Sequence, residues 1–493
     1  MNAYPEIRSL AVDMGASNVR IMLGEISVTG IETREIYRFP NHTIEREGHE
    51  RWAIKHIISE ITGGLKRAVD VAGGHIASVG VDAWGVDFAM LDGAGKLLEL
   101  PVAYRDGRTE GMEEKWLGMM SRRETFERSG INFYIFNTLF QLLSMKGSKV
   151  LASTSRILFL PSYVLHALGG RPVNELTISS TSQLLNASSG EWDSRILDLL
   201  GIQAHILGEV CQPGTITGEV DHPELKMPGT RTISVCAHDT ASAVVAVPFG
   251  EDASVFISTG TWCLLGMETD RPILTTEALT EGFTNERGYA GTFRCLKNIV
   301  GLWLVQGLMK SLPVGDDFDH IENLARQYGR APNIINPDDP LFYNPGDMQE
   351  AFDEYFRKTG QAPPSEPGGY FRCAYDSLIY SFRYHIEKLE KLTGKTIRTI
   401  HLMGGGCQSR YLTSQTASIC QRRVVSGPVE AATIGNLLVQ AMALGTLPGL
   451  EACRDLVRNA MVVGTHEPDP PVAEHEAGYL KYLEIKVQAA WDT

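Results

Sequence analysis

The sequence predicts an α/β protein made of two domains. The chain has 493 residues, more than one hydrophobic core usually organises, so we expect two domains or two lobes around a cleft. Segments typical of strands alternate with segments typical of helices, which favours the α/β class. Two hairpin patterns of the same plan, one near the start of each half, indicate a duplicated fold that faces a common ligand.

The first half opens with a predicted hairpin, because apolar and β-branched residues in 8–26 flank a Gly-Ala-Ser reversal. Residues 52–72 carry apolar side chains at helical spacing and end at two glycines, which predicts a helix. Residues 77–92 return to a strand pattern that breaks at Trp84 and Gly85.

The second half repeats this plan. Its predicted elements are a hairpin at 253–268, a helix at 376–392, a strand ending in a glycine loop at 397–408, a helix at 431–444 and a last helix near 479–490. Proline, glycine and acidic residues near 245–252 indicate a boundary, which gives an N-terminal domain of residues 1–247 and a C-terminal domain of residues 248–493.

Composition narrows the classes of partner. The chain is 43% hydrophobic and 21% charged, as in ordinary globular enzymes, and its net charge of −14 repels nucleic acid and anionic membranes. Its N-terminus lacks a signal-peptide pattern, and no apolar run approaches about 18 residues. The eight cysteines are scattered without a Cys-x-x-Cys pair, which predicts free thiols. We therefore expect a cytoplasmic protein that binds neither nucleic acid nor membranes.

Three glycine-containing turns are candidates for binding phosphate. The tip of the first hairpin offers backbone N–H groups, the Ser17 hydroxyl and the Arg20 guanidinium, and Asp13 beside it is a candidate ligand for Mg²⁺, directly or through water. Residues 258–261 form a similar tip in the second hairpin, and residues 404–406 form a glycine loop between a strand and a helix. Each turn alone is equally well explained as an ordinary tight reversal.

The stretch VDAWGVDF, residues 81–88, is a candidate sugar site. Trp84 and Phe88 flank Gly85, and an aromatic wall beside bare backbone and carboxylates suits a sugar, whose C–H face stacks while its hydroxyls form hydrogen bonds. The alternative is a strand bend with Trp84 in the core.

The stretch SVCAHDTASAVVAV, residues 234–247, places three polar side chains between apolar runs. Asp239 is a candidate general base that accepts a proton from a substrate hydroxyl during phosphoryl transfer. The alternative is a helix N-cap by Asp239 or Thr240, with His238 as a satisfied neighbour. Both roles are compatible.

With these residues assembled, the sequence resembles the FGGY family of carbohydrate kinases. The matching stretches run in family order from about residue 10 to about residue 440 and are VDMGASNVR, GVDAWGVDF, LPVAYRDGRT, CAHDTASAV, STGTW, LKNIVGLWLVQ, INPDDPLFYNPGDM, MGGGCQ and GPVEAATIGN. The resemblance implies two ribonuclease-H-like domains of the actin-like ATPase fold around a central cleft.

The resemblance also implies an activity. It implies transfer of the γ-phosphate of ATP, with Mg²⁺, to the C1 hydroxyl of L-rhamnulose, giving L-rhamnulose 1-phosphate and ADP in L-rhamnose catabolism. L-fuculose or another ketose is an alternative substrate, and a non-catalytic sensor of sugar or nucleotide is an alternative class. The expected partner is a small-molecule ketose, and the choice between a monomer and a homodimer stays open.

By motif position, the resemblance assigns roles to individual residues. It implies that Asp239 is the proton acceptor. The implied sugar contacts are Gly85, His238, Asp239, Thr240 and Asn298. The implied nucleotide contacts are Ala16, Ser17, Asn18, Val19, Arg20, Thr261, Gln306 and Gly405, with Val19 standing where relatives often have glycine.

Overall fold

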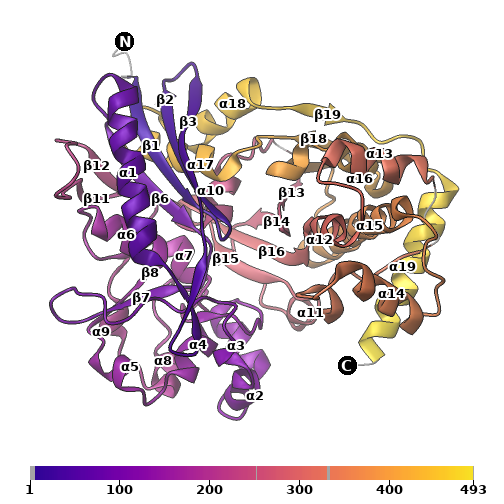
Figure 1. The fold of residues 1–493 in the computed structure, drawn as a ribbon, viewed down its shortest axis with the longest axis horizontal. Helices are drawn as coiled ribbons and strands as arrows, with labels where there is room; N and C mark the ends of the chain where they lie inside the picture. The colour runs from indigo at the N-terminus through magenta and orange to yellow at the C-terminus, as the bar shows by residue number, and fades with distance from the viewer. Residues whose placement is uncertain (1–5, 251, 330–332, 492–493) are drawn as a thin grey trace. The chain divides into compact units, whose positions relative to one another are not determined.

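The computed structural model describes residues 6–250, 252–329 and 333–491 (Figure 1). Residue 251, in the predicted boundary stretch, and residues 1–5, in the segment examined for a signal peptide, lie outside the described residues. The chain divides into two compact units. Unit 1 comprises Met1–Ala246, Glu268–Cys295 and Ala431–Ala460, and unit 2 comprises Val247–Met267, Leu296–Glu430 and Met461–Thr493. Two segments of the second half thus belong to unit 1, and the predicted domain boundary at residue 247 stays a prediction.

Unit 1 is built on a six-stranded mixed sheet with the order β11-β12-β6-β1-β2-β3. Its strands are β1 (Ile7–Met14), β2 (Asn18–Ile26), β3 (Ile31–Pro40), β6 (Ser78–Ala83), β11 (Thr215–Glu219) and β12 (Arg231–Ser234). The hairpin predicted at residues 8–26 is confirmed, since β1 and β2 pair antiparallel in register. Strand β6 runs parallel to both β1 and β12, so their carboxyl ends meet at one edge.

The remaining elements of unit 1 are shorter strands and helices. The strands are β4 (Thr43–Arg46), β5 (His49–Trp52), β7 (Phe88–Leu91), β8 (Arg156–Phe159), β9 (Asn174–Glu175), β10 (Val210–Cys211) and β15 (Thr284–Arg287). The helices are α1 (Ile54–Ala72), α2 (Met112–Leu117), α3 (Arg122–Ser129), α4 (Thr138–Ser144), α5 (Lys149–Ser153), α6 (Leu160–Ala167), α7 (Leu176–Ser180), α8 (Ser194–Leu200), α9 (Ala204–Leu207), α10 (Asp239–Val245), α11 (Thr276–Thr280), α17 (Ala431–Ala443) and α18 (Leu450–Ala460).

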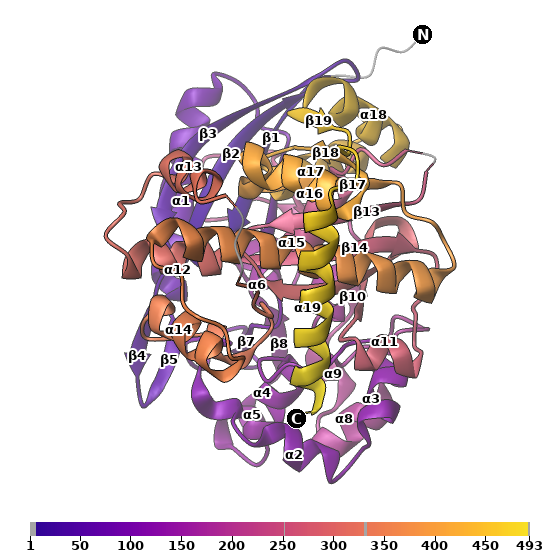
Figure 2. The same cartoon turned by 90° about the vertical axis from the view of Figure 1, so that its right-hand side faces the viewer.

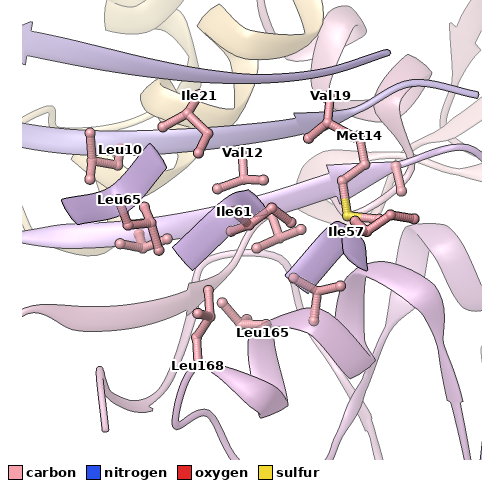
Figure 3. Close-up of a cluster of buried hydrophobic side chains, with 14 of the residues drawn as sticks. Leu10, Val12, Met14, Val19, Ile21, Ile57, Ile61, Leu65, Leu165 and Leu168 are labelled. Carbon is pink, nitrogen blue, oxygen red and sulfur yellow. The ribbon is translucent and has the colours of Figure 1, made fainter. Parts of the chain in front are cut away.

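One face of the six-stranded sheet forms an apolar core. Because side chains alternate along a strand, Leu10, Val12 and Met14 of β1 all point to this face, where Figure 3 shows them against side chains of α1 and of the α6 region. Each such fully buried side chain stabilises the fold by about 1.5–3 kcal/mol. The helix predicted at residues 52–72 is confirmed as α1, and it ends at Gly73 in the left-handed conformation, with φ 60°.

The opposite face of the sheet is polar and lined by small residues. Ser9, Ala11 and Asp13 of β1 alternate with the core residues, as do Ser78, Gly80 and Asp82 of β6. Helix α17 packs against β1 and β6. A Cβ on Gly80 would lie 2.7 Å from Asn436 Oδ1, so glycine permits this close approach. This face of the sheet therefore brings acidic side chains next to polar groups of α17.

Unit 2 contains most of a second sheet, with its own set of helices (Figure 2). Neighbouring strands follow the order β16 (Phe293–Val300), β14 (Trp262–Thr269), β13 (Ser254–Thr259), β17 (Thr399–Met403), β18 (Arg423–Ser426) and β19 (Gly464–His466). Residues 268–269 of β14 and residues 293–295 of β16 belong to unit 1, where β15 is the neighbour of β16. The helices are α12 (Trp303–Ser311), α13 (Phe318–Gln327), α14 (Met348–Lys358), α15 (Pro367–Thr393), α16 (Arg410–Cys420) and α19 (Ala473–Trp491).

The second predicted hairpin and the strand before the glycine loop are confirmed as β13, β14 and β17. Helix α15 begins nine residues earlier than the predicted start at Asp376, because Pro367 and the two glycines after it do not break it. Proline is tolerated in the first turn, and Gly368 and Gly369 lie where a Cβ would meet Leu324 and Tyr328. Helix α19 begins at Ala473, ahead of the predicted start near Tyr479. Among the described residues, no helix is long and apolar enough to cross a membrane.

Candidate active site

Two neighbouring strands of unit 1 each carry an aspartate near the carboxyl end. Asp13 of β1 and Asp82 of β6 are register partners in the parallel pair. Arg20 Nη2 donates to Asp13 Oδ2 at 2.6 Å, and the Thr433 hydroxyl donates to the same oxygen at 3.2 Å. The carboxylate is therefore held on both sides, by β2 and by α17.

Asp82 is completely buried, whereas the sequence predicted it only as one of the carboxylates of the candidate sugar site at residues 81–88. Asn436 Nδ2 donates to its Oδ2 at 2.6 Å, whereas its buried Oδ1 has no hydrogen-bond partner among the described residues. Burial, followed by the negative charge of Asp13, raises the pKa of the Asp82 carboxyl well above its ordinary value. The signal that could have found it is the repeated Val-Asp at the end of both strands.

Asp239 approaches the same edge of the sheet at the start of α10. The segment after β12 continues beside β6, with Ala83 N–H donating to Ala237 O at 2.9 Å and Ala83 bridged to His238. The Asp239 side chain is 34% exposed, so a substrate can reach it. Burial raises the pKa of this carboxyl, with Asp13 adding to the shift and His238 opposing it. Unit 1 thus gathers Asp13, Asp82 and Asp239.

The predicted capping role of the His-Asp-Thr triplet is wrong in its detail. The N-cap of α10 is His238, and its side chain makes no capping hydrogen bond. Asp239 is the first helical residue, and its Oδ1 accepts hydrogen bonds from the backbone and hydroxyl of Thr240 at 2.5 and 3.1 Å. The imidazole is turned elsewhere: its Nδ1 lies 3.0 Å from Glu286 Oε2 of β15.

The proposed aromatic wall of Trp84 and Phe88 is not exposed. Both side chains are buried, and Trp84 packs on Trp52 with ring centroids 4.3 Å apart. The indole N–H of each tryptophan donates to Asp87 Oδ2, at 2.9 and 2.6 Å. The alternative interpretation, a strand bend with Trp84 in the core, is confirmed, and Val86 makes the bend with φ 68°.

Half-buried aromatic side chains lie beside the Gly85 loop instead. Tyr134 and Phe136 stack with centroids 5.2 Å apart, and Tyr104 meets Phe136 edge-on at 6.0 Å. Gln141 ties these residues to the loop, because its Nε2 donates to Phe136 O at 2.9 Å and to Asp87 Oδ1 at 3.2 Å. Sequence reasoning missed this aromatic cluster, although the run FYIF at residues 133–136 was a visible signal.

The residues at the tip of the first hairpin differ in how far they are exposed. Ser17 is exposed, Ala16, Asn18 and Arg20 are half-buried, and Val19 is fully buried in the core. Asn41 braces the tip, since its Nδ2 donates to Gly15 O at 3.0 Å and its N–H to Ser17 O at 2.9 Å. The Val19 side chain therefore cannot meet a ligand, and this position offers only backbone.

In unit 2, the tip of the second hairpin lies against the glycine loop. The Thr259 hydroxyl donates to Met403 O at 2.6 Å, and a Cβ on Gly406 would lie only 2.7 Å from that hydroxyl oxygen. Gly404 has φ 80°, which favours glycine. The turn leading into α12 joins them, because Leu302 N–H donates to Gly260 O at 2.9 Å.

Three of the predicted nucleotide residues lie on these segments. Thr261 O accepts from the Trp303 N–H at 3.2 Å, and Gln306 follows one turn later on α12. Gly405 is exposed in the glycine loop. Asn298, a predicted sugar contact, is half-buried on β16, beside Lys297. Unit 2 thus brings Thr261, Gln306 and Gly405 onto one set of connected loops.

Comparison with known proteins gives a consistent match along the chain. Residues 9–246 match the N-terminal domain, and residues 255–444 the C-terminal domain, of the FGGY family of carbohydrate kinases. A rhamnulokinase from Enterococcus faecalis is 38% identical over 467 residues, covering 94% of each chain. A rhamnulokinase from Bacteroides thetaiotaomicron is 39% identical over 478 residues, covering 96% of this chain and 98% of its own.

The fold is also similar to solved structures of sugar kinases. The crystal structure of gluconate kinase from Lactobacillus acidophilus matches with a TM-score of 0.81 at 15% identity, and the match covers 99% of both chains. At that level of identity the likeness concerns the fold alone. It confirms the predicted α/β fold of the actin-like ATPase type.

Proposed function

Because the chain belongs to the FGGY family of carbohydrate kinases and is an ATP-dependent sugar kinase, we propose that its substrate is L-rhamnulose, phosphorylated at the C1 hydroxyl. The observation that carries the choice of sugar is the near full-length similarity to rhamnulokinases. The products are L-rhamnulose 1-phosphate and ADP, in L-rhamnose catabolism.

The eight cysteines are free and buried, which supports a cytoplasmic site of action. The two family models match on either side of residue 247, which supports that boundary between the proposed domains.

Asp239 is the proton acceptor in this proposal. The C1 oxygen forms a bond to the γ-phosphorus while the bond from that phosphorus to the β–γ bridging oxygen breaks, and ADP leaves. The hydroxyl proton passes to an Asp239 carboxylate oxygen. A raised pKa makes this carboxylate a stronger base than an ordinary aspartate. The Asp239 side chain is 34% exposed, which gives the C1 hydroxyl of the sugar access to it.

Mg²⁺ is proposed at the strand-end aspartates. The donor set fits, because carboxylate oxygens are hard ligands and the buried Oδ1 of Asp82 lacks a partner among the described side chains. Asp13 would hold the ion, directly or through water, and the ion would neutralise charge on the phosphates. The proposed nucleotide contacts are Ala16, Ser17, Asn18, Arg20, the backbone of Val19, Thr261, Gln306 and Gly405.

The sugar is proposed to contact Gly85, His238, Thr240 and Asn298. The aromatic cluster of Tyr104, Tyr134 and Phe136 supports a sugar site beside Gly85, because half-buried rings offer a surface for C–H groups. Burial raises the pKa of Tyr104, Arg105 opposes the shift, and the negative charges of Asp87 and then Asp239 add to it, which supports a place for this ring near the proposed base.

The test is a coupled ADP-release assay over a panel of ketoses. We expect a clearly higher kcat/KM for L-rhamnulose than for L-fuculose or L-xylulose, and the reverse order would overturn the choice of sugar. Binding of a ketose or of ATP without ADP release above background would instead favour the alternative class, a non-catalytic sensor of sugar or nucleotide.

The same assay tests the base. The Asp239→Asn variant is expected to fold and bind ATP while kcat falls by about 10²–10⁴-fold, because the amide cannot take the proton. Near-normal turnover of that variant would show that Asp239 is not the proton acceptor.

A further inference from the structure

Helix α4 turns two buried polar side chains towards the bend at Val86, the residue that follows Gly85. Thr138 and Gln141 lie three positions apart on this helix, so they share one face. The Thr138 hydroxyl donates to Val86 O at 2.7 Å, and Gln141 Nε2 donates to the same oxygen at 3.4 Å. A valine with φ 68° is strained and persists where neighbouring groups hold it, and α4 supplies two such groups.

The side-chain amide of Gln141 has one orientation that satisfies its neighbours. Its Nε2 donates to Phe136 O at 2.9 Å, and a main-chain carbonyl can only accept. Its Oε1 accepts from Arg108 Nη2 at 2.5 Å, and a guanidinium can only donate. The amide nitrogen therefore faces Phe136 and Asp87, where it donates to Asp87 Oδ1 at 3.2 Å, and the amide oxygen faces Arg108.

Opposite charges lie at the two ends of this amide. Asp87 is buried, and Arg108 is half-buried, with an Nε that is buried and has no hydrogen-bond partner among the described residues. Burial lowers the pKa of Arg108, and the negative charge of Asp87 is the strongest influence that opposes this shift. The amide dipole points its oxygen at the cation and its nitrogen at the anion, so both charges stabilise the orientation of Gln141.

The same carboxylate also holds the other side of the aromatic cluster. The Tyr104 N–H donates to Asp87 Oδ2 at 3.2 Å. Tyr104 is thus fastened to Asp87 directly, and Phe136 is fastened to it through Gln141. Because the rings of Tyr104 and Phe136 meet edge-on, this chain of hydrogen bonds determines where the cluster lies beside the Gly85 bend.

We propose that Gln141 and Arg108 are positioning residues for the ketose: Gln141 holds Phe136 beside the Gly85 bend, and Arg108 acts on the sugar site through Gln141. This inference rests on the proposed sugar site. Gln141 is 1% exposed, so its effect on a ligand passes through the ring that it holds. A fixed wall binds a sugar more tightly and more selectively than a mobile one, because less ordering is needed on binding.

The decisive variant is Gln141→Met, which keeps the length of the side chain and removes its hydrogen bonds. We expect the KM for the ketose to rise about 10- to 100-fold, with the KM for ATP within about twofold, because the sugar wall alone is loosened. The ratio of kcat/KM for L-rhamnulose to that for L-fuculose is expected to fall towards one. A merely structural role would lower turnover of every ketose by the same factor, and an unchanged ratio would overturn the proposal.

A double-variant cycle tests the route from Arg108. Arg108→Met is expected to raise the KM for the ketose about 10-fold. Because Arg108 acts through Gln141, we expect the double variant to have a ketose KM within about twofold of that of Gln141→Met alone. Effects of the two substitutions that multiply would overturn this route. Arg108→Lys keeps the charge and can still donate, so we expect it to retain part of the affinity lost in Arg108→Met.

The chain offers a matched control in Gln361→Met. In unit 2, Gln361 Nε2 donates to Ile334 O at 2.8 Å, and its Oε1 accepts the Ile334 N–H at 2.9 Å. We expect the control to lose a similar amount of stability while both KM values and the selectivity stay unchanged. Urea denaturation shows which variants fold. If Gln141→Met does not fold, Arg108→Met still decides, because a ketose KM equal to that of the wild type would overturn the proposal.

Amide hydrogen exchange, measured by mass spectrometry, follows the aromatic segment without turnover. We expect faster exchange of residues 131–137 in Gln141→Met and also in Arg108→Met, although the side-chain hydrogen bonds of Arg108 go to Gln141 and Met145. Unchanged exchange of that segment in either variant would overturn the inference. If the wild type phosphorylates no ketose, the proposed function fails, while this measurement still decides whether Arg108 and Gln141 hold the segment.

Discussion

Asp87 illustrates how a single buried carboxylate can govern the loop that carries Gly85. It is 1% exposed, and its Oδ2 accepts from Trp52, Trp84 and the Tyr104 N–H. Burial raises its pKa from 3.8 to about 6, although the hydrogen bonds from both tryptophans and Gln141 oppose the shift. Since the folded pKa is the higher one, Asp87 contributes stability below pH 3.8 that is lost as the pH rises through about 6.

The Asp87→Asn variant removes this titration. We expect the free energy of unfolding of the wild type, relative to that of the variant, to fall by about 2–3 kcal/mol between about pH 4 and about pH 7. Urea denaturation of both proteins across that range measures the difference. A difference that stays flat, or grows with pH, would show that burial does not control this carboxyl.

At the level of elements, the contact between α10 and α17 fixes the position of Asp239. A Cβ on Gly435 of α17 would lie 1.7 Å from Ser242 O of α10, so the two helices touch backbone to backbone. We expect Gly435→Ala to destabilise the protein by about 1–3 kcal/mol and to lower kcat, because α10 carries Asp239 at its first residue.

The matched control for this substitution is Gly63→Ala in α1. No atom lies within 4 Å of the added Cβ there, so we expect a gain of about 0.5–1 kcal/mol from helix propensity and an unchanged kcat. Thermal unfolding and the ADP-release assay measure both variants. Equal stability of the two alanine variants would refute the role of the close contact.

An element could be predicted from the sequence where the pattern that produces it lies within a few neighbouring residues. The two hairpins, α1 and α17 follow from periodic patterns within a few residues, and the structure confirms them. The start of α15 and the burial of Trp84 depend on distant partners. The hydrogen bond between Asn436 and Asp82 joins residues 354 positions apart, and no local pattern encodes it. The roles assigned from family motifs stay predictions.

At the scale of the whole molecule, the site residues of unit 1 depend on both halves of the chain. Helix α17 supplies Thr433 to Asp13 and Asn436 to Asp82, and residues 268–295 supply Glu286 and Arg294 to His238. The N-terminal half alone would therefore expose one face of β1 and β6 that α17 covers in the full chain. A functional boundary at residue 247 is thus not expected to be a folding boundary.

A fragment of residues 1–247 tests whether the boundary at residue 247 is also a folding boundary. We expect it to lack a cooperative urea transition by circular dichroism, because it loses α17 and the 268–295 segment that complete its unit. Mixing it with a fragment of residues 248–493 is expected to restore the transition. The control is the full-length chain cut at an inserted protease site near residue 250, which we expect to stay assembled, since its contacts form before the cut. A sigmoidal transition of the 1–247 fragment alone would show that the segments from the second half are dispensable for folding.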